Sequence, residues 1–215
     1  TDAVRRVQSA LGDACVGVYS GLIQRAPLST AVEATKMALD VEVDTLVGVG
    51  GSTISDAARM IAVMMAEGIT SEQRLRELGH QFDGMLEPDL AGKQLPLQVS
   101  IPTTLSAGEF NRGGGNILDD QASHKIRVRH PDLYAHLIVL DPEMTVGTPD
   151  WLWLSTGVKA MDHCIERLYC KGNQPATEAT TLMAAELLFN YLPKSPDSCN
   201  DLNARLQSFS AAVSD

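Results

Sequence analysis

The sequence has few basic residues and no long apolar run, and each shortage excludes a class of protein. Lysine and arginine number 17 against 27 aspartate and glutamate residues, which gives a net charge of −10 over 215 residues. Because no segment is rich in Lys or Arg, we do not expect a nucleic acid or a membrane surface as partner. No apolar run approaches the length of a membrane-spanning helix, and the residues after Thr1 do not resemble a secretion signal.

Cysteine is also scarce. The four cysteines, Cys15, Cys164, Cys170 and Cys199, lack the C-x-x-C spacing of zinc sites. Scattered cysteines are typical of a reducing compartment, so we expect a cytoplasmic protein. His124, His130 and His136 recur at even spacing but match no ligand pattern on one strand or helix turn, so we expect solvated or capping histidines.

The first two thirds of the chain contain alternating strand-like and helix-like stretches. The predicted strands are residues 14–19, 45–49, 97–101, 116–119, 125–129 and 137–140, with a hairpin of 116–119 and 125–129. The predicted helices are residues 4–11, 29–39 (with Thr30 and Glu33 as a capping box) and 53–67. Strands joined by helical crossovers imply an α/β fold, a Rossmann-like parallel sheet with helices on both faces.

The pattern after residue 142 is helical. A long helix is expected from Asp150, its N-terminal cap, to Cys170, and another from Thr177 to Tyr191. We therefore expect an α/β domain over residues 1–147 and the first part of an all-helical domain over residues 148–215. Helical patterns at both ends of the chain indicate a piece of a longer protein.

A glycine-rich turn follows the strand at residues 45–49. Gly50, Gly51 and Ser52 lead directly into an amphipathic helix, so the backbone can turn tightly and present unpaired helix N–H groups to an anion. The spacing is neither G-x-G-x-x-G nor the glycine loop that ends in Lys-Ser/Thr. The turn predicts a phosphate or pyrophosphate site. An ordinary strand-to-helix turn is the alternative, since Gly-Gly-Ser is common in βα units.

A second polar loop, residues 102–109, follows the next predicted strand. Since the carboxyl ends of parallel strands share one edge of the sheet, its Thr103, Thr104 and Ser106 are expected beside the glycine turn. The two loops together would enclose one phosphorylated ligand. The alternative is that the threonines only cap a turn.

The predicted helix over residues 150–170 has two faces. Val158, Met161, Ile165 and Leu168 form an apolar stripe that we expect in the core, and Lys159, Asp162, His163 and Glu166 lie opposite. The polar side is either a solvated face with a weak Lys159–Asp162 ion pair, or part of a cleft. In a cleft, Lys159 and His163, four residues apart, would polarise a carbonyl or transfer a proton.

Four segments in chain order resemble the iron-containing alcohol dehydrogenase superfamily, whose fold is shared with dehydroquinate synthase. Gly50 to Asp56 is similar to the G-G-G-S-x-x-D loop, with Ser52 replacing the third glycine. Residues 102–109 resemble the P-T-T…G-S-E signature in the shorter form of the maleylacetate reductase branch, with Gly108 at the serine position. Residues 141–145 resemble the D-P-E-L-T of that branch, and residues 157–166 resemble the metal-helix motif G-x-D-A-x-x-H-x-x-E.

The resemblance implies an oxidoreductase that uses NAD or NADP and acts on a small carbonyl compound, such as a keto acid, or on an alcohol. Matched onto this chain, Gly50, Gly51, Ser52 and Asp56 would hold the pyrophosphate. Thr103, Thr104 and Ser106 would line the nicotinamide side, and Lys125 would reach the ribose.

One departure from the family concerns the metal. Metal-dependent members bind a divalent ion with an aspartate and with the histidine four residues later, and Lys159 stands at the aspartate position. An ammonium group has no lone pair for a metal and repels it. Maleylacetate reductases also lack the aspartate and work without metal, so the resemblance implies a metal-free enzyme. Lys159 would stabilise the forming alkoxide, and His163 would assist substrate binding or proton transfer.

An alternative of another class stays open, because a lysine-substituted piece of this fold would also serve as a non-catalytic or non-redox binding or assembly module. The resemblance places the family's first strand before Thr1 and further helices after Asp215. The apolar surface that those helices would cover favours pairing with another chain. We therefore expect a homo-oligomer, a dimer.

Overall fold

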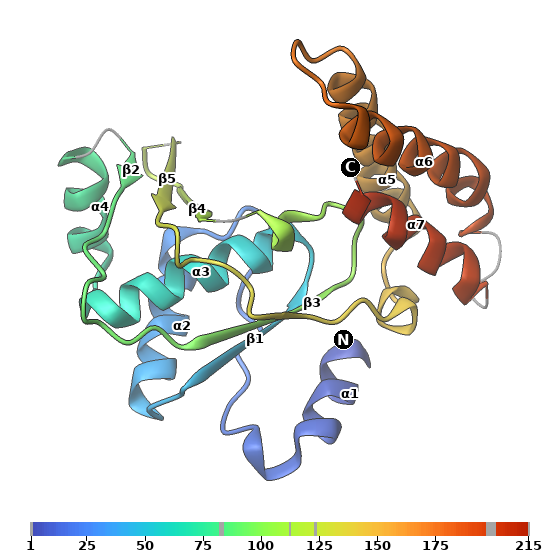
Figure 1. Ribbon diagram of the computed structural model, residues 1–215. Helices are drawn as coiled ribbons and strands as arrows, with labels where there is room; N and C mark the ends of the chain where they lie inside the picture. Colours follow the sequence, from blue (N-terminus) through green and yellow to red (C-terminus); the bar gives the residue numbers. More distant parts are fainter. Residues whose placement is uncertain (1, 82–83, 112, 123, 197–200, 215) are drawn as a thin grey trace. The chain divides into compact units, whose positions relative to one another are not determined.

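The computed structural model describes residues 2–81, 84–111, 113–122, 124–196 and 201–214 (Figure 1). The chain divides into two compact units. We call residues 5–100 and 108–138 the sheet unit, and residues 1–4, 101–107 and 139–215 the helical unit. The predicted helix at the start of the chain is α1 (Asp2–Leu11), none of whose residues is buried. Cys199 lies outside the described residues.

The sheet unit is built on two three-stranded sheets. One has β1 (Thr45–Gly50), β3 (Leu97–Pro102) and β6 (Leu137–Ile138), with β3 in the middle and β6 parallel to it. The other has β2 (Met85–Leu86), β5 (His124–Arg129) and β4 (Gly114–Asp119), with β5 in the middle. β2 is parallel to β5, whereas β4 and β5 form the predicted antiparallel hairpin. The parallel pairs and the helices confirm the predicted α/β class.

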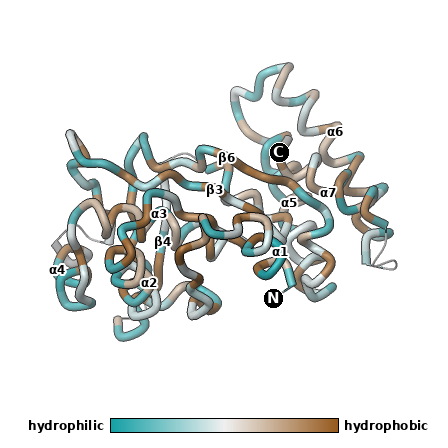
Figure 2. Tube along the Cα trace, turned by 90° about the horizontal axis from the view of Figure 1, so that it is seen from below, coloured by the Kyte–Doolittle hydropathy of each residue, from teal (hydrophilic) through white to brown (hydrophobic). Residues whose placement is uncertain are grey.

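Helix α3 (Ser52–Glu67) forms much of the core of the sheet unit. Its apolar run from Met60 to Met64 is buried, and the helix packs against α2 (Leu28–Asp40), β1 and β4. Figure 2 shows hydrophobic positions concentrated on α3 and along β6. The helix ends at Gly68, where a φ of +65° favours glycine as the C-cap. The polar stretch that follows contains α4 (Glu72–Gln81).

Two local predictions are wrong in this part of the chain. Residues 14–19 form no strand, because Ala14 ends a 3-10 turn and Val16, 60% exposed, pairs with no strand of the described chain. Thr30 does not form a capping box with Glu33. The Thr30 hydroxyl donates to the carbonyl of Pro27, the N-cap of α2, and the Glu33 carboxylate accepts from the Tyr19 hydroxyl.

The helical unit contains α5 (Asp150–Leu168), α6 (Pro175–Tyr191) and α7 (Leu202–Ser214). Asp150 was predicted to cap α5, but Pro149 is the N-cap and Asp150 is the first helical residue. Trp153 lies in the centre of this unit, edge-on to the ring of Phe209 and 4.8 Å from the guanidinium of Arg205. Among the described residues, no helix has both the length and the apolar character to cross a membrane.

The buried face of α5 differs from the prediction. Val158 and Ile165, expected in the core with Met161 and Leu168, are 62% and 49% exposed. The buried residues of α5 are Trp153, Gly157, Ala160 and Cys164. A Cβ at Gly157 would lie 2.4 Å from Leu192 Cδ1, so small residues on this face allow close packing against the chain after α6. Apolar character alone did not predict this, because the fit between surfaces selects the face that is buried.

Candidate functional site

The turn between β1 and α3 exposes backbone N–H groups. Gly50 ends β1, Gly51 is the N-cap, and Ser52 begins the helix. A Cβ at Gly50 would lie 2.5 Å from Ile54 Cγ1, so the turn requires glycine there. The first helical bonds run from the Ile54 and Ser55 amides to the Gly51 carbonyl, at 2.9 and 3.4 Å. The amides of Ser52 and Thr53 therefore have no acceptor within α3, which suits an anion.

Gly108, the residue that follows the loop after β3, packs on this turn. Gly108 begins a short 3-10 turn (Gly108–Phe110), and a Cβ at Gly108 would lie 3.0 Å from Ser52 Cβ. Residue 108 therefore lies directly against the first helical residue of α3. Both residues differ from the family motifs that the segments resemble. Ser52 stands at a glycine position of one motif, and Gly108 stands at a serine position of the other.

Asp56 lies on α3 one turn after Ser52. Its carboxylate accepts a 2.5 Å hydrogen bond from Asn116 Nδ2 and lies 3.5 Å from Arg59 Nη1. Burial raises the pKa of Asp56, and the charges of Arg59 and Lys125 and the Asn116 bond oppose this rise. Lys125, exposed on β5, thus lies within electrostatic range of Asp56.

Arg59 was not predicted from the sequence to belong to this site. Its side chain is 1% exposed and donates to the carbonyls of Gly108 (2.9 Å), Glu109 (3.0 Å) and Gly114 (3.0 Å). It therefore ties α3 to the loop after β3 and to the start of β4. A charged residue inside the apolar run that follows Asp56 is the signal that would have identified it.

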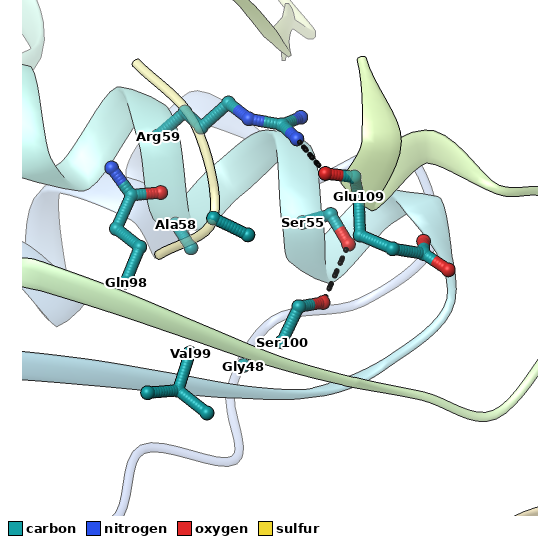
Figure 3. A pocket seen from close by; sticks show the side chains of 9 residues that line it. Gly48, Ser55, Ala58, Arg59, Gln98, Val99, Ser100 and Glu109 are labelled. Atoms are coloured by element: carbon teal, nitrogen blue, oxygen red, sulfur yellow. Dashed lines mark hydrogen bonds between the residues drawn. The ribbon is translucent and has the colours of Figure 1, made fainter. Parts of the chain in front are cut away.

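Figure 3 shows a small cavity of the sheet unit behind these contacts. Ser55 and Ser100 face each other across 3.4 Å, and Arg59 bonds to the backbone of Glu109. The cavity volume is about 10 Å³, roughly room for one water molecule, so it does not admit a nucleotide. Glu109 is 3% exposed, and burial raises the pKa of its carboxyl.

Thr103, Thr104 and Ser106 lie in the helical unit, on the loop after β3. The hydroxyls of Thr104 and Ser106 are 2.9 Å apart, so these two predicted residues lie together. The Thr103 carbonyl accepts from Thr148 Oγ1 at 2.8 Å. Ala107 stands at the glycine position of the G-S-E motif and has a φ of +51°. This backbone conformation is strained, and so raises the free energy of the fold, for any residue with a Cβ.

Lys159 and His163 lie one turn apart on α5. Lys159 Nζ is 2.6 Å from Asp162 Oδ2, and both side chains are about half exposed, at 54% and 53%. The hydrogen bond and charge of Lys159 lower the pKa of Asp162, and His163 adds to this effect. The Lys159–Asp162 ion pair expected from the sequence is therefore present. His163 lies close enough to influence the carboxylate of Asp162 electrostatically.

The chain departs at Lys159 from the metal-ligating motif that residues 157–166 resemble. Within the part of the chain that the structure describes, no three His, Cys, Asp or Glu side chains cluster as metal ligands would. At the motif position where an aspartate would ligate, Lys159 carries an ammonium group that cannot. Two of the evenly spaced histidines accept backbone hydrogen bonds, His130 from Asp132 at 3.3 Å and His136 from Gln98 at 3.1 Å.

Known sequences match most of the chain. The family model described as iron-containing alcohol dehydrogenase matches residues 1–142. The chain is 32% identical over 183 residues to the dehydrogenase FUM7 of Gibberella moniliformis, covering 82% of this chain and 42% of that protein. It is 25% identical over 211 residues to maleylacetate reductase 2 of Cupriavidus pinatubonensis, covering 98% and 50%. The chain thus spans about half the length of the curated relatives that it matches.

A solved structure has the same fold. The sulfoacetaldehyde reductase of Bifidobacterium kashiwanohense, in complex with NAD+, has a TM-score of 0.80 to this chain. The match covers 98% of this chain and 54% of that one at 20% identity. The family model covers well over half of the chain, and the glycine turn and the loop after β3 both lie within the matched residues. The chain therefore belongs to the iron-containing alcohol dehydrogenase family.

Proposed function

We propose that the protein is an NAD(P)-dependent oxidoreductase of the iron-containing alcohol dehydrogenase type. It would reduce a small carbonyl compound, such as a keto acid, or oxidise an alcohol. The single observation that carries the proposal is the turn at Gly50–Ser52, where amides without helical acceptors follow a glycine that a Cβ would not fit. The names of the relatives support it, since they are dehydrogenases and reductases, and one was solved with NAD+.

The residues assigned to the cofactor are those of the two loops and the hairpin. Gly50, Gly51 and Ser52 would hold the pyrophosphate through backbone amides, with Asp56 fixing the following turn of α3. Lys125 would reach the ribose, and Thr103, Thr104 and Ser106 would line the nicotinamide side. When bound, the cofactor supplies or accepts the hydride, and the protein contributes position and charge.

Lys159 and His163 are assigned to the substrate. The ammonium of Lys159 would stabilise the negative oxygen formed at the substrate carbonyl, in the place of a metal ion. His163, one turn away, would bind the substrate or deliver the proton that completes the alcohol. The two groups together suit a substrate that carries a carboxylate. We further propose that residues 1–147 form the nucleotide-binding domain, that residues 148–215 begin the substrate domain, and that the protein is a dimer.

The test combines binding, turnover and metal content. NADH and NADPH are titrated separately into the 215-residue chain, and a rise in nicotinamide fluorescence reports binding. Oxidation of the cofactor on addition of a keto acid supports the enzyme. Binding without turnover supports a binding module, and no binding of either cofactor contradicts the proposal. A stoichiometric metal whose removal abolishes turnover contradicts the role of Lys159.

Variants on α5 separate the charge of Lys159 from general effects. Lys159→Ala should lower turnover by about 100-fold or more, the scale of losing one group that stabilises an oxyanion. Arg167→Gln, which removes an exposed positive charge near the end of the same helix, should leave turnover unchanged. Equal losses in the two variants would contradict the assignment.

A further inference from the structure

We propose that the small cavity of the sheet unit is a binding site for one water molecule, held by the hydroxyls of Ser55 and Ser100 and by the carboxyl group of Glu109 (Figure 3). These residues come from α3, from β3 and from the 3-10 turn over Gly108–Phe110. All three belong to the sheet unit, and the site does not depend on the proposed cofactor.

The cavity has the size and the lining that a single water molecule needs. Its volume is about 10 Å³, close to the smallest volume that holds one water. A small cavity takes up a water where about two to four polar groups face it, whereas apolar cavities stay dry. Ser55, Ser100 and Glu109 line this cavity and are 6%, 6% and 3% exposed. Their polar atoms are therefore shielded from the bulk solvent.

The hydrogen bonds of these groups are incomplete within the described part of the chain. Ser55 Oγ and Ser100 Oγ lie 3.4 Å apart, a long contact that uses only one of the two hydroxyl protons. The second hydroxyl proton has no acceptor among the described residues. Glu109 Oε2 is buried and likewise has no partner among them. One donor and one acceptor thus remain at the same cavity, and leaving buried polar groups unpaired is costly.

One water molecule supplies both missing partners. It accepts from the serine hydroxyl that has no other acceptor, and it donates one proton to Glu109 Oε2. Its second proton is available for the oxygen of the other serine. Figure 3 shows both hydroxyls on the side of the cavity where Glu109 lies, and the amide of Gln98 on the opposite side. Gln98 Nε2 also has no described partner, but this position keeps it outside the proposed site.

The charges around the cavity favour a neutral occupant. Arg59, 1% exposed, lines the same cavity, and its positive charge repels a metal ion or an ammonium ion. An anion would meet the carboxyl group of Glu109. A bound water links Glu109 to α3 and β3, whereas the Arg59 hydrogen bonds link the same turn to α3 and β4. The water therefore completes the attachment of this turn to the sheet unit.

A high-resolution crystal structure and a count of long-lived waters by magnetic relaxation dispersion test the site. The crystal structure should contain a water within about 2.6–3.2 Å of Ser55 Oγ, Ser100 Oγ and Glu109 Oε2. In solution, Ser100→Val should remove one long-lived water, because its methyl groups fill the cavity and the hydroxyl is lost. Glu109→Gln should keep the water, since an amide also bonds to it. Ser155→Ala is the control and should keep the original count, because Ser155 is an exposed serine whose hydroxyl donates to the Leu152 carbonyl.

Three outcomes would overturn the proposal. The first is a crystal structure in which the cavity is empty and a serine hydroxyl bonds directly to Glu109. The second is an unchanged water count in Ser100→Val, with the circular dichroism spectrum of a folded chain. The third is an anomalous signal in the cavity after a rubidium soak, which would identify a cation. The crystal structure of the original chain decides the question even if Ser100→Val does not fold.

Discussion

Arg59 brings a positive charge into the interior of the sheet unit. Burial lowers the pKa of its guanidinium, and the nearby carboxylates of Asp56 and Glu109 act in the opposite direction. Its hydrogen bonds join three backbone segments, so its loss would leave buried carbonyl groups without a donor. The cost of such orphaned groups exceeds the value of the ion pair with Asp56.

Arg59→Met should therefore destabilise the protein by about 3–5 kcal/mol, the cost of removing one partner from a buried charged network. The free energy of unfolding, measured with urea, checks this. Arg74→Met is the control, because the Arg74 side chain is 58% exposed and forms a surface ion pair with Glu77. It should change the free energy of unfolding by less than about 0.5 kcal/mol. If neither variant changed the free energy of unfolding by more than about 0.5 kcal/mol, the stabilising role of the Arg59 hydrogen bonds would be contradicted.

Ala107 carries local backbone strain. With a φ of +51°, Ala107→Gly should raise the free energy of unfolding by about 0.5–1 kcal/mol, as the relief of strain outweighs the added freedom of the unfolded chain. Equilibrium unfolding in urea measures the difference. Replacing Ala91, which does not have a positive φ, by glycine should give no gain, and an equal gain there would refute the assignment of strain.

At the scale of elements, α4 is tied to the end of β4 by one buried carboxylate. Arg76 Nε donates to Asp119 Oδ1 at 3.1 Å, and Asp119 is 0% exposed. Burial alone would raise the pKa of Asp119, but the Arg76 hydrogen bond and backbone bonds outweigh it and lower the pKa. A carboxyl with a lowered folded pKa stabilises the fold above its unfolded pKa and loses this contribution as pH falls through the folded value.

Asp119→Asn should accordingly lower the free energy of unfolding by about 1–3 kcal/mol at pH 7. The difference from the original chain should shrink as pH falls below about 4, the unfolded pKa of aspartate. Urea unfolding at a series of pH values gives the two curves. Parallel curves at every pH would show that the carboxylate charge of Asp119 does not contribute.

At the scale of the whole molecule, several large apolar side chains of the helical unit are exposed. Trp151, Val158, Tyr169 and Phe189 are 67%, 62%, 85% and 77% exposed. Exposed apolar side chains that lie side by side mark contacts with another chain or segment. The predicted core stripe of α5 contributes to this surface, since Val158, Ile165 and Leu168 are exposed.

The chain should therefore associate in a concentration-dependent way and bind a hydrophobic dye. Phe189→Glu combined with Val158→Lys should reduce both, measured by sedimentation and by dye fluorescence. Glu166→Lys, a charge change on the same helix that removes no apolar surface, should have little effect. A monomer that binds no dye at high concentration would contradict the expectation.

Local patterns in the sequence were enough to predict most of the helices and strands and the α/β class. The glycine turn, α3 and the hairpin of β4 and β5 follow from periodicity and from turn residues, which act over a few neighbouring positions. The motifs also led to the family. The roles of the ten site residues and the boundary at residue 147 stay predictions, because they concern a ligand and a substrate that local patterns do not contain.

Which distant side chains meet could not be predicted, because it depends on how the whole chain folds. The bond between Arg59 and the Gly108 carbonyl joins residues 49 positions apart, and no periodicity reports such a contact. The buried face of α5 was likewise selected by the small Gly157 against Leu192, in preference to the more apolar stripe of Val158 and Ile165. Packing depends on the shape of the opposing surface, and that surface comes from distant parts of the chain.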